Sequence, residues 1–131
     1  MTITSTAPLR LEGIGQIAVN VQDLERATTF YRDVLGLTFL FAVPGMAFFD
    51  CGGVRLLLGR AERPELDHPA SILYYRVEDI AAVHRTLAAR GVAFEDPPHP
   101  VHRAETYVLW LAFFRDSEAN LAALMSEVPR E

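Results

Sequence analysis

The most constraining feature of this sequence is an internal repeat. A Val-x-Asp motif that opens a helix-like segment starts at Val21 and again at Val77, and a glycine ends each segment, at Gly36 and at Gly91. The valines are 56 positions apart and the glycines 55, so the spacing is conserved to within one residue. This period lies near the upper end of ordinary structural repeats. We therefore expect two similar modules in tandem.

Each repeat has the pattern of a strand, a helix and three further strands. Apolar residues alternate with polar ones before the Val-x-Asp motif, as in a half-buried strand. Asp23 is suited to cap the first helix, and Gly36 to end it. We expect an α+β fold, in which two tandem βαβββ modules form a curved mixed sheet around a cleft. The expected boundaries are a single domain over 1–131, with modules over 14–59 and 71–128 and a connector over 60–70.

The alternation also predicts which residues face the cleft. Side chains of one parity should pack against the helices, because each helix buries one face of its sheet. The other parity should line the cleft. In the first module this set is Gln16, Ala18, Asn20, Arg55 and Leu57, and in the second it is Ile72, Tyr74, Arg76, Leu121, Ala123 and Met125.

Composition excludes several classes of protein. Half of the 131 residues are apolar, which is enough for a core. The net charge is −5 and the arginines are scattered among acidic residues, so no track for nucleic acid is expected. Cys51 is the only cysteine, which excludes an internal disulfide. No apolar run has the length of a membrane span. We expect a cytoplasmic protein with a small-molecule ligand, no membrane or nucleic-acid partner, and a homodimer built on its apolar strands.

Three segments resemble the vicinal oxygen chelate superfamily, which includes glyoxalases, bleomycin-resistance proteins and extradiol dioxygenases. They are Ile14 to Leu37, the Val-Glu-Asp-Ile motif at Val77, and Phe113 to Leu121. The last segment resembles an Asp-Pro-x-Gly-Asn turn of the family, but Ser117 and Ala119 replace its proline and glycine. We expect that hairpin to be intact in outline and altered in detail.

The resemblance implies four ligand positions for a metal ion, one on each of four strands. Gln16 matches the first position, where glutamine is an accepted ligand. The other three positions match Leu57, Ile72 and Ala123, whose side chains cannot bind a metal. The resemblance thus predicts the fold and the cleft but not the usual metal centre, and Gln16 is expected to orient a ligand.

A second group of polar residues follows in the segment from His99 to Tyr107. His99 and His102, with Gln16, could form a relocated site for zinc, nickel, iron or manganese. The sequence is equally compatible with a protein that binds no metal. Alternatively a histidine acts as a general base while Arg103 holds an anionic substrate. A solvated loop without a function is the third interpretation. Prolines at 97, 98 and 100 exclude a helix here.

Two functions remain open from the sequence. One is an enzyme, a glyoxalase-like lyase or isomerase or a dioxygenase-like oxygenase, acting on a small oxygenated molecule. The other is a binding protein that sequesters a hydrophobic or aromatic molecule, as bleomycin-resistance proteins do. The candidate catalytic residues are His99, His102 and Glu105, and the candidate substrate-binding residues are Gln16, Asn20, Arg55, Tyr74, Arg76, Arg103, Tyr107 and Trp110.

Overall fold

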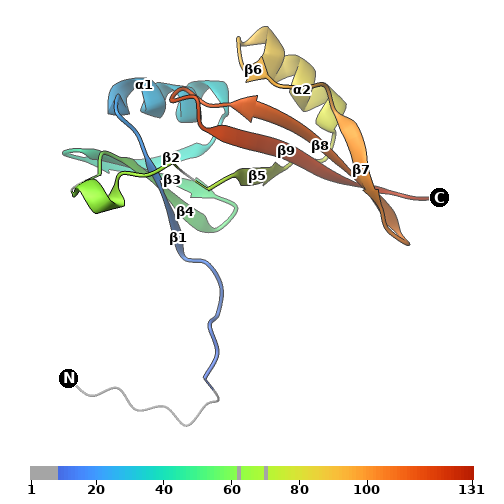
Figure 1. Ribbon diagram of the computed structural model, residues 1–131, viewed down its shortest axis with the longest axis horizontal. Helices are drawn as coiled ribbons and strands as arrows, with labels where there is room; N and C mark the ends of the chain where they lie inside the picture. The colour runs from blue at the N-terminus through green and yellow to red at the C-terminus, as the bar shows by residue number, and fades with distance from the viewer. Residues whose placement is uncertain (1–8, 62, 70) are drawn as a thin grey trace.

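A computed structural model describes residues 9–61, 63–69 and 71–131, which form two mixed sheets and two α-helices (Figure 1). The first module contains β1 (Gln16–Asn20), α1 (Leu24–Thr29), a π-helical turn (Phe30–Val34), β2 (Thr38–Val43), β3 (Met46–Cys51) and β4 (Val54–Gly59). A 3-10 turn (Pro64–Leu66) lies in the connector. The second module contains β5 (Leu73–Arg76), α2 (Ile80–Ala89), β6 (Ala93–Phe94), β7 (His99–Arg103), β8 (Tyr107–Arg115) and β9 (Leu121–Pro129).

The two sheets have matching topologies. The first has the strand order β1-β4-β3-β2, and the second has β5-β9-β8-β6, with β7 also paired to β8. In each sheet the strand before the helix is parallel to the last strand, β1 to β4 and β5 to β9. The predicted α+β fold with tandem modules is confirmed, and the strands divide into two sheets.

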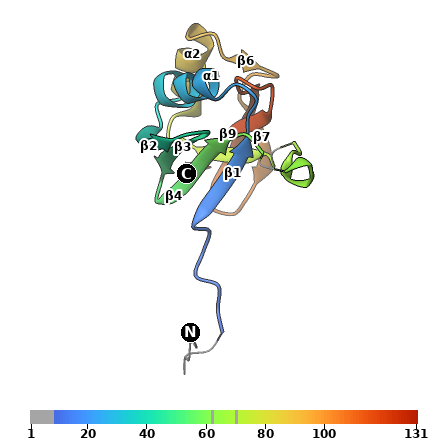
Figure 2. The same ribbon diagram turned by 90° about the vertical axis from the view of Figure 1, so that its left-hand side faces the viewer.

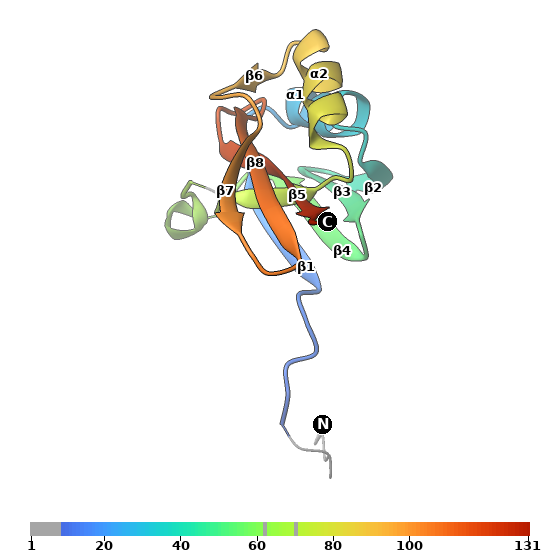
Figure 3. The same cartoon turned by 90° about the vertical axis from the view of Figure 1, so that its right-hand side faces the viewer.

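The segment with many prolines is part of the second sheet. β6 and β7 pair with successive stretches of β8, so together they occupy the place of one interrupted strand (Figure 3). Pro97 and Pro98 lie at the interruption, where a proline cannot donate a backbone hydrogen bond. The sequence predicts a loop from Asp96 to Ala104, whereas His99–Arg103 is a strand.

The repeated motif begins and ends both helices as predicted. The carboxylate of Asp23 accepts a hydrogen bond from the amide of Arg26 at 3.0 Å, and Asp79 does the same for Ala82 at 3.0 Å. Gly36 and Gly91 have φ values of +78° and +91°, a conformation that an L side chain disfavours. Within the described ranges, neither helix is long and apolar enough to cross a membrane.

Two apolar clusters form the core, one between each helix and its sheet. Val19, Ala27 and Phe49 belong to the first cluster, and Leu87 and Phe114 belong to the second. α1 and α2 lie on the same side of the two sheets (Figures 1 and 2). The π-helical turn after α1 joins the clusters, because Phe30 packs against both of them. The modules therefore share a packed interface.

The turn between β8 and β9 adds a buried polar contact to this interface. The hydroxyl of Tyr31 donates to Oδ2 of Asp116 at 2.7 Å, and Oδ1 of Asp116 accepts from the amides of Glu118 and Asn120 at 2.8 Å each. Burial is the main cause that raises the pKa of Tyr31 far above its ordinary value, so this hydroxyl stays protonated and remains a donor.

Glu118, in the same turn, caps the first helix from the other module. Its Oε1 accepts hydrogen bonds from the amides of Gln22 at 2.9 Å and Asp23 at 2.8 Å, and its Oε2 pairs with Arg26 at 3.2 Å. The carboxylate thus satisfies two backbone donors just before the helix, near its positive end, where a negative charge is favourable. Glu118, at the variable position of the family's turn motif, is therefore a structural link between the modules.

Ala119 gives the altered hairpin a strained residue. It is the one non-glycine residue with positive φ, +63°, in the part of the chain that the structure describes. The hairpin expected between β8 and β9 is present. Because this conformation disfavours a Cβ, Ala119→Gly should raise the free energy of unfolding by about 1 kcal/mol, measured by urea denaturation. Ala93→Gly, in exposed β6, should lower it; equal effects of the two changes would contradict this account.

Candidate functional site

The face of the first sheet opposite α1 carries two aromatic rings and a guanidinium group. Gln16 lies opposite Arg55 across β1 and β4, Leu57 lies opposite Phe48 across β4 and β3, and Phe48 lies opposite Phe41 across β3 and β2. Residues that are directly opposite one another share a face of a sheet. We refer to Gln16, Phe41, Phe48, Arg55 and Leu57 as the aromatic face.

The rings of this face are stacked and accessible. The centroids of Phe41 and Phe48 are 4.5 Å apart with an interplanar angle of 21°, and Phe41 is 44% exposed. Cζ of Arg55 lies 5.9 Å from the Phe48 centroid, within the range of a cation–π contact. Arg55 forms no ion pair with any described carboxylate. Asp50 lies directly opposite Arg55 on this face, where its Oδ1 accepts a hydrogen bond from the amide of Gly53 at 3.1 Å, so the guanidinium is left without an ion-pair partner.

A β-bulge creates the ring stack. The pairing of β2 with β3 shifts between Phe39 and Phe41, so that Phe39 lies opposite Phe49 and Phe41 lies opposite Phe48. On an unbroken strand Phe39 and Phe41 would share a face. Instead Phe39 packs edge to face on buried Phe49, and Phe41 joins the opposite face. Neither ring of the stack is among the site residues that the sequence predicts.

A second bulge brings the two histidines of β7 together on one face. The register of β7 against β8 shifts between Pro100 and His102, so His99 lies opposite Leu111 and His102 lies opposite Leu109. Leu109 and Leu111 share a face, so both imidazoles do as well. Through β8 and β9 this face continues to β5. We refer to this set as the histidine face: Tyr74, Arg76, His99, His102, Leu111, Met125 and Glu127.

The other candidates of this segment lie apart from the histidines. Arg103 lies opposite Val108, on the same side of the sheet as Trp110, which packs against the second core cluster. Glu105 is exposed in the loop between β7 and β8. Tyr107 lies on the side of the histidines but opposite Pro129, at the end of the sheet. The segment thus does not converge on one centre.

The donor atoms do not fit a divalent metal ion. Of the four ligand positions implied by the family, only Gln16 carries a donor; Leu57, Ile72 and Ala123 carry none. Nδ1 of His99 is 2.9 Å from the carbonyl oxygen of Pro97. Among the described residues, no group of three or more His, Cys, Asp or Glu side chains could hold a metal ion.

A cavity of about 970 Å³ lies between the two modules. Tyr74 and Arg76 line it, as do Ile17 and Leu56 from the helix side of the first sheet. Gln16 and Arg55 are not among its lining residues. The expected cleft between the polar faces therefore differs from this cavity, which we call the intermodule cavity. The difference arises because Leu73 of β5 packs against the core cluster of the first module.

Asn20, another candidate, is engaged in structure. Its side-chain amide donates to the carbonyl oxygens of Leu66 and of His68, the latter at 3.2 Å, and so fastens the connector to the end of β1. Cys51 lines the intermodule cavity. Burial, and to a smaller extent Asp50, raises the pKa of this thiol, so it is a poor nucleophile at neutral pH.

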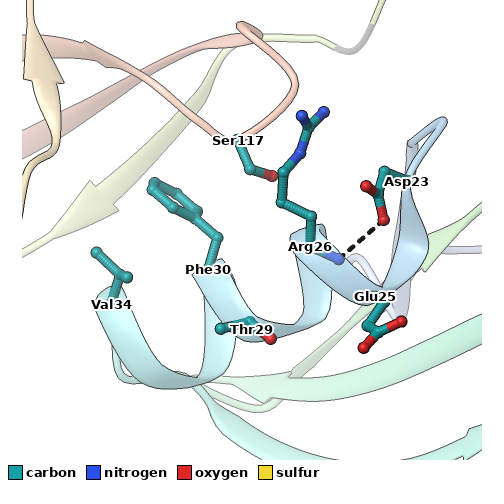
Figure 4. Close-up of a pocket in the computed structure, with 7 residues that line it drawn as sticks. All are labelled: Asp23, Glu25, Arg26, Thr29, Phe30, Val34 and Ser117. Atoms are coloured by element: carbon teal, nitrogen blue, oxygen red, sulfur yellow. Dashed lines mark hydrogen bonds between the residues drawn. The ribbon is translucent and has the colours of Figure 1, made fainter.

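A smaller depression of about 530 Å³ lies between α1 and the β8–β9 turn (Figure 4). Asp23, Arg26, Phe30 and Ser117 are among its lining residues. Two of its charged groups have structural partners, since Asp23 caps the helix and Arg26 pairs with Glu118. The buried hydroxyl of Ser117 has no hydrogen-bond partner among the described residues.

The two helix-opening motifs and the turn from Asp116 to Asn120 all lie within a region that matches a known protein family. A family model described as the Glyoxalase/Bleomycin resistance protein/Dioxygenase superfamily matches residues 13–124. The chain belongs to this superfamily. YraH of Bacillus subtilis is 31% identical over 120 residues, which cover 81% of this chain and 91% of YraH.

Two further relatives of this superfamily member differ from each other in function. Metallothiol transferase FosB of Staphylococcus haemolyticus is 32% identical over 71 residues, covering 54% of this chain and about half, 48%, of FosB. TnmS3, an antibiotic binding protein from Streptomyces sp. CB03234, is 25% identical with a TM-score of 0.73, over 92% of this chain and 99% of TnmS3. The superfamily scaffold thus serves both an enzyme and a binding protein among the relatives.

Proposed function

We propose that this superfamily member binds a small planar aromatic anion on the aromatic face, without a metal ion and as a homodimer. The observation that carries the proposal is the stacked pair of Phe41 and Phe48 beside the unpaired guanidinium of Arg55. Flat rings offer a surface for a third ring, and aromatic pairs add about 0.5–1.5 kcal/mol beyond the burial of area.

The polar groups of the face favour an anionic substituent. Arg55 presents a planar fork of donors that matches a carboxylate. Gln16 lies directly opposite Arg55, where its amide can donate to or accept from the same ligand. Leu57 lies beside them at a position where metal-using relatives would carry a ligand, so the face is apolar there. These contacts together support a ring with an acidic group.

A second copy of the chain would complete such a site. The aromatic face is not covered by the second module, and the edge strand β2 is exposed along its whole length. Phe39, Leu40, Phe41 and Val43 are exposed large apolar residues. Exposed apolar residues along an edge strand commonly mark an interface, and Phe41 and Val43 are on the aromatic face itself. In the proposed homodimer, the partner would shield the ligand from water.

Binding of 1-naphthoate, measured by isothermal titration calorimetry in the presence of EDTA, tests this proposal. Arg55→Gln should weaken binding about tenfold, because a charge-assisted hydrogen bond is lost, and should leave binding of neutral 1-naphthamide unchanged. Arg85→Gln, on exposed α2, is the matched control and should have no effect. Equal affinities of the wild type and Arg55→Gln for 1-naphthoate would refute the site, and loss of binding in EDTA would refute metal independence.

The position of the two histidines favours catalysis as a second candidate function. His99 and His102 share a face with Arg76 but lie three strand spacings from it, roughly 14 Å, so an imidazole could move a proton only at the far end of an elongated anion held by the guanidinium. This would be the chemistry of a lyase or isomerase acting on a small oxygenated molecule. Turnover in the presence of EDTA that is lost in both His99→Ala and His102→Ala would support it.

A further inference from the structure

The intermodule cavity is separate from the aromatic face. From the first sheet it takes Ile17 and Leu56, whose side chains lie on the side of α1, whereas Gln16 and Arg55 lie on the opposite side. We infer that this cavity is a second binding site, for an elongated amphipathic molecule with an apolar body and one carboxylate at its end.

The size and walls of the cavity suit an apolar body. Its volume of about 970 Å³ lies at the upper end of the range of about 300–1,000 Å³ that is usual for small-molecule sites. Leu56, Leu87 and Phe114 are buried residues that contribute to its walls. Val83 of α2 lies on the wall as well, so the cavity reaches from the first sheet to the second helix. Transfer of a hydrocarbon chain into this space stabilises the complex by about 0.8 kcal/mol per buried methylene.

Both charged residues that line the cavity are exposed. These residues are Arg76 and Glu127, and both are on the histidine face. Arg76 of β5 lies opposite Met125 of β9, and Glu127 is two residues after Met125 on β9. Arg76 is exposed and forms no ion pair with any described carboxylate. The guanidinium can therefore hold a carboxylate while the apolar chain extends inward.

Glu127 sets a limit on the charge of the ligand. Its carboxylate lies diagonal to Arg76 across β5 and β9, a separation at which long side chains still interact. It therefore repels a second negative charge on a ligand held by Arg76. The pair selects a ligand with a single carboxylate over a dicarboxylate.

Cys51 provides a direct readout of occupancy. It is the only cysteine of the chain, and it lines this cavity. Decanoate should slow the alkylation of Cys51 by N-ethylmaleimide, followed by mass spectrometry of the intact protein. Arg76→Gln should weaken protection by decanoate about tenfold and leave protection by decanol unchanged, whereas Glu127→Gln should strengthen protection by decanoate.

Val83→Phe is designed to fill the cavity and should abolish protection by decanoate. Its control is Val101→Phe, a similar change at an exposed position of β7 outside the cavity, which should protect like the wild type. Sedimentation velocity of each variant tests whether a second chain occupies the cavity instead. The inference is overturned if decanoate protects Cys51 in Val83→Phe as well as in the wild type. It is also overturned if Arg76→Gln weakens protection by decanoate and by decanol equally. A third contrary result is that Val83→Phe changes only the oligomeric state.

Discussion

Replacing Asp116 by alanine should lower the free energy of unfolding by about 3 kcal/mol, because several donors lose a buried acceptor at once. The residue is 8% exposed. Its carboxylate accepts hydrogen bonds from the hydroxyl of Tyr31 and from the amides of Glu118 and Asn120. The measurement is urea unfolding followed by circular dichroism at neutral pH.

Two further variants separate this network from a general effect of charge removal. Tyr31→Phe removes one of the hydrogen bonds and should cost about 1 kcal/mol. Asp33→Ala removes an exposed carboxylate that pairs with neighbouring Arg32, and it should change stability little. If Asp116→Ala and Asp33→Ala are equally stable, the contact between the modules does not have the role that we assign to it.

Phe49→Ala should destabilise the protein by about 4 kcal/mol, whereas Phe48→Ala, the adjacent change, should cost about 1 kcal/mol. Phe49 is 0% exposed and packs with the rings of Tyr31 and Phe39. Phe48 lies on the opposite face, where it stacks on exposed Phe41. Both losses are measured as shifts of the urea midpoint at constant slope.

The same pair of variants connects stability with binding. Phe48→Ala removes one ring of the proposed ligand platform, so it should weaken binding of 1-naphthoate while the protein remains folded. Phe49→Ala should retain the affinity in the fraction that is folded. Equal losses of stability in the two variants would show that the faces of β3 are assigned wrongly.

Much of the fold could be predicted because its signals are local. The helix caps at Asp23 and Asp79 and the left-handed glycines after both helices depend on a few neighbouring residues. The hairpin between β3 and β4 is local as well, since Gly52 and Gly53 supply the positive φ values of +60° and +91° between the two strands. Alternation alone also assigned Val19 and Val21 to the helix side, where both are buried.

The candidate site was harder to predict because it depends on register. His99 and His102 are three residues apart, and strict alternation would separate them onto two faces. The bulge that unites them is set by how β7 pairs with β8, and the bulge that moves Phe41 is set by how β2 pairs with β3. No neighbouring residue in the sequence specifies either pairing.

The family, the order of the two modules and the helix boundaries could all be predicted from the sequence alone, because they follow from residue identity and short-range geometry. The same holds for the absence of donor side chains at Leu57, Ile72 and Ala123. Only the tertiary structure decided where the polar residues meet. The packing of Leu73 against the first module places β5 beside the helix side of the first sheet. Arg76 and Arg55 consequently belong to different candidate sites, because long-range packing, and not chain alternation, sets which surfaces face each other.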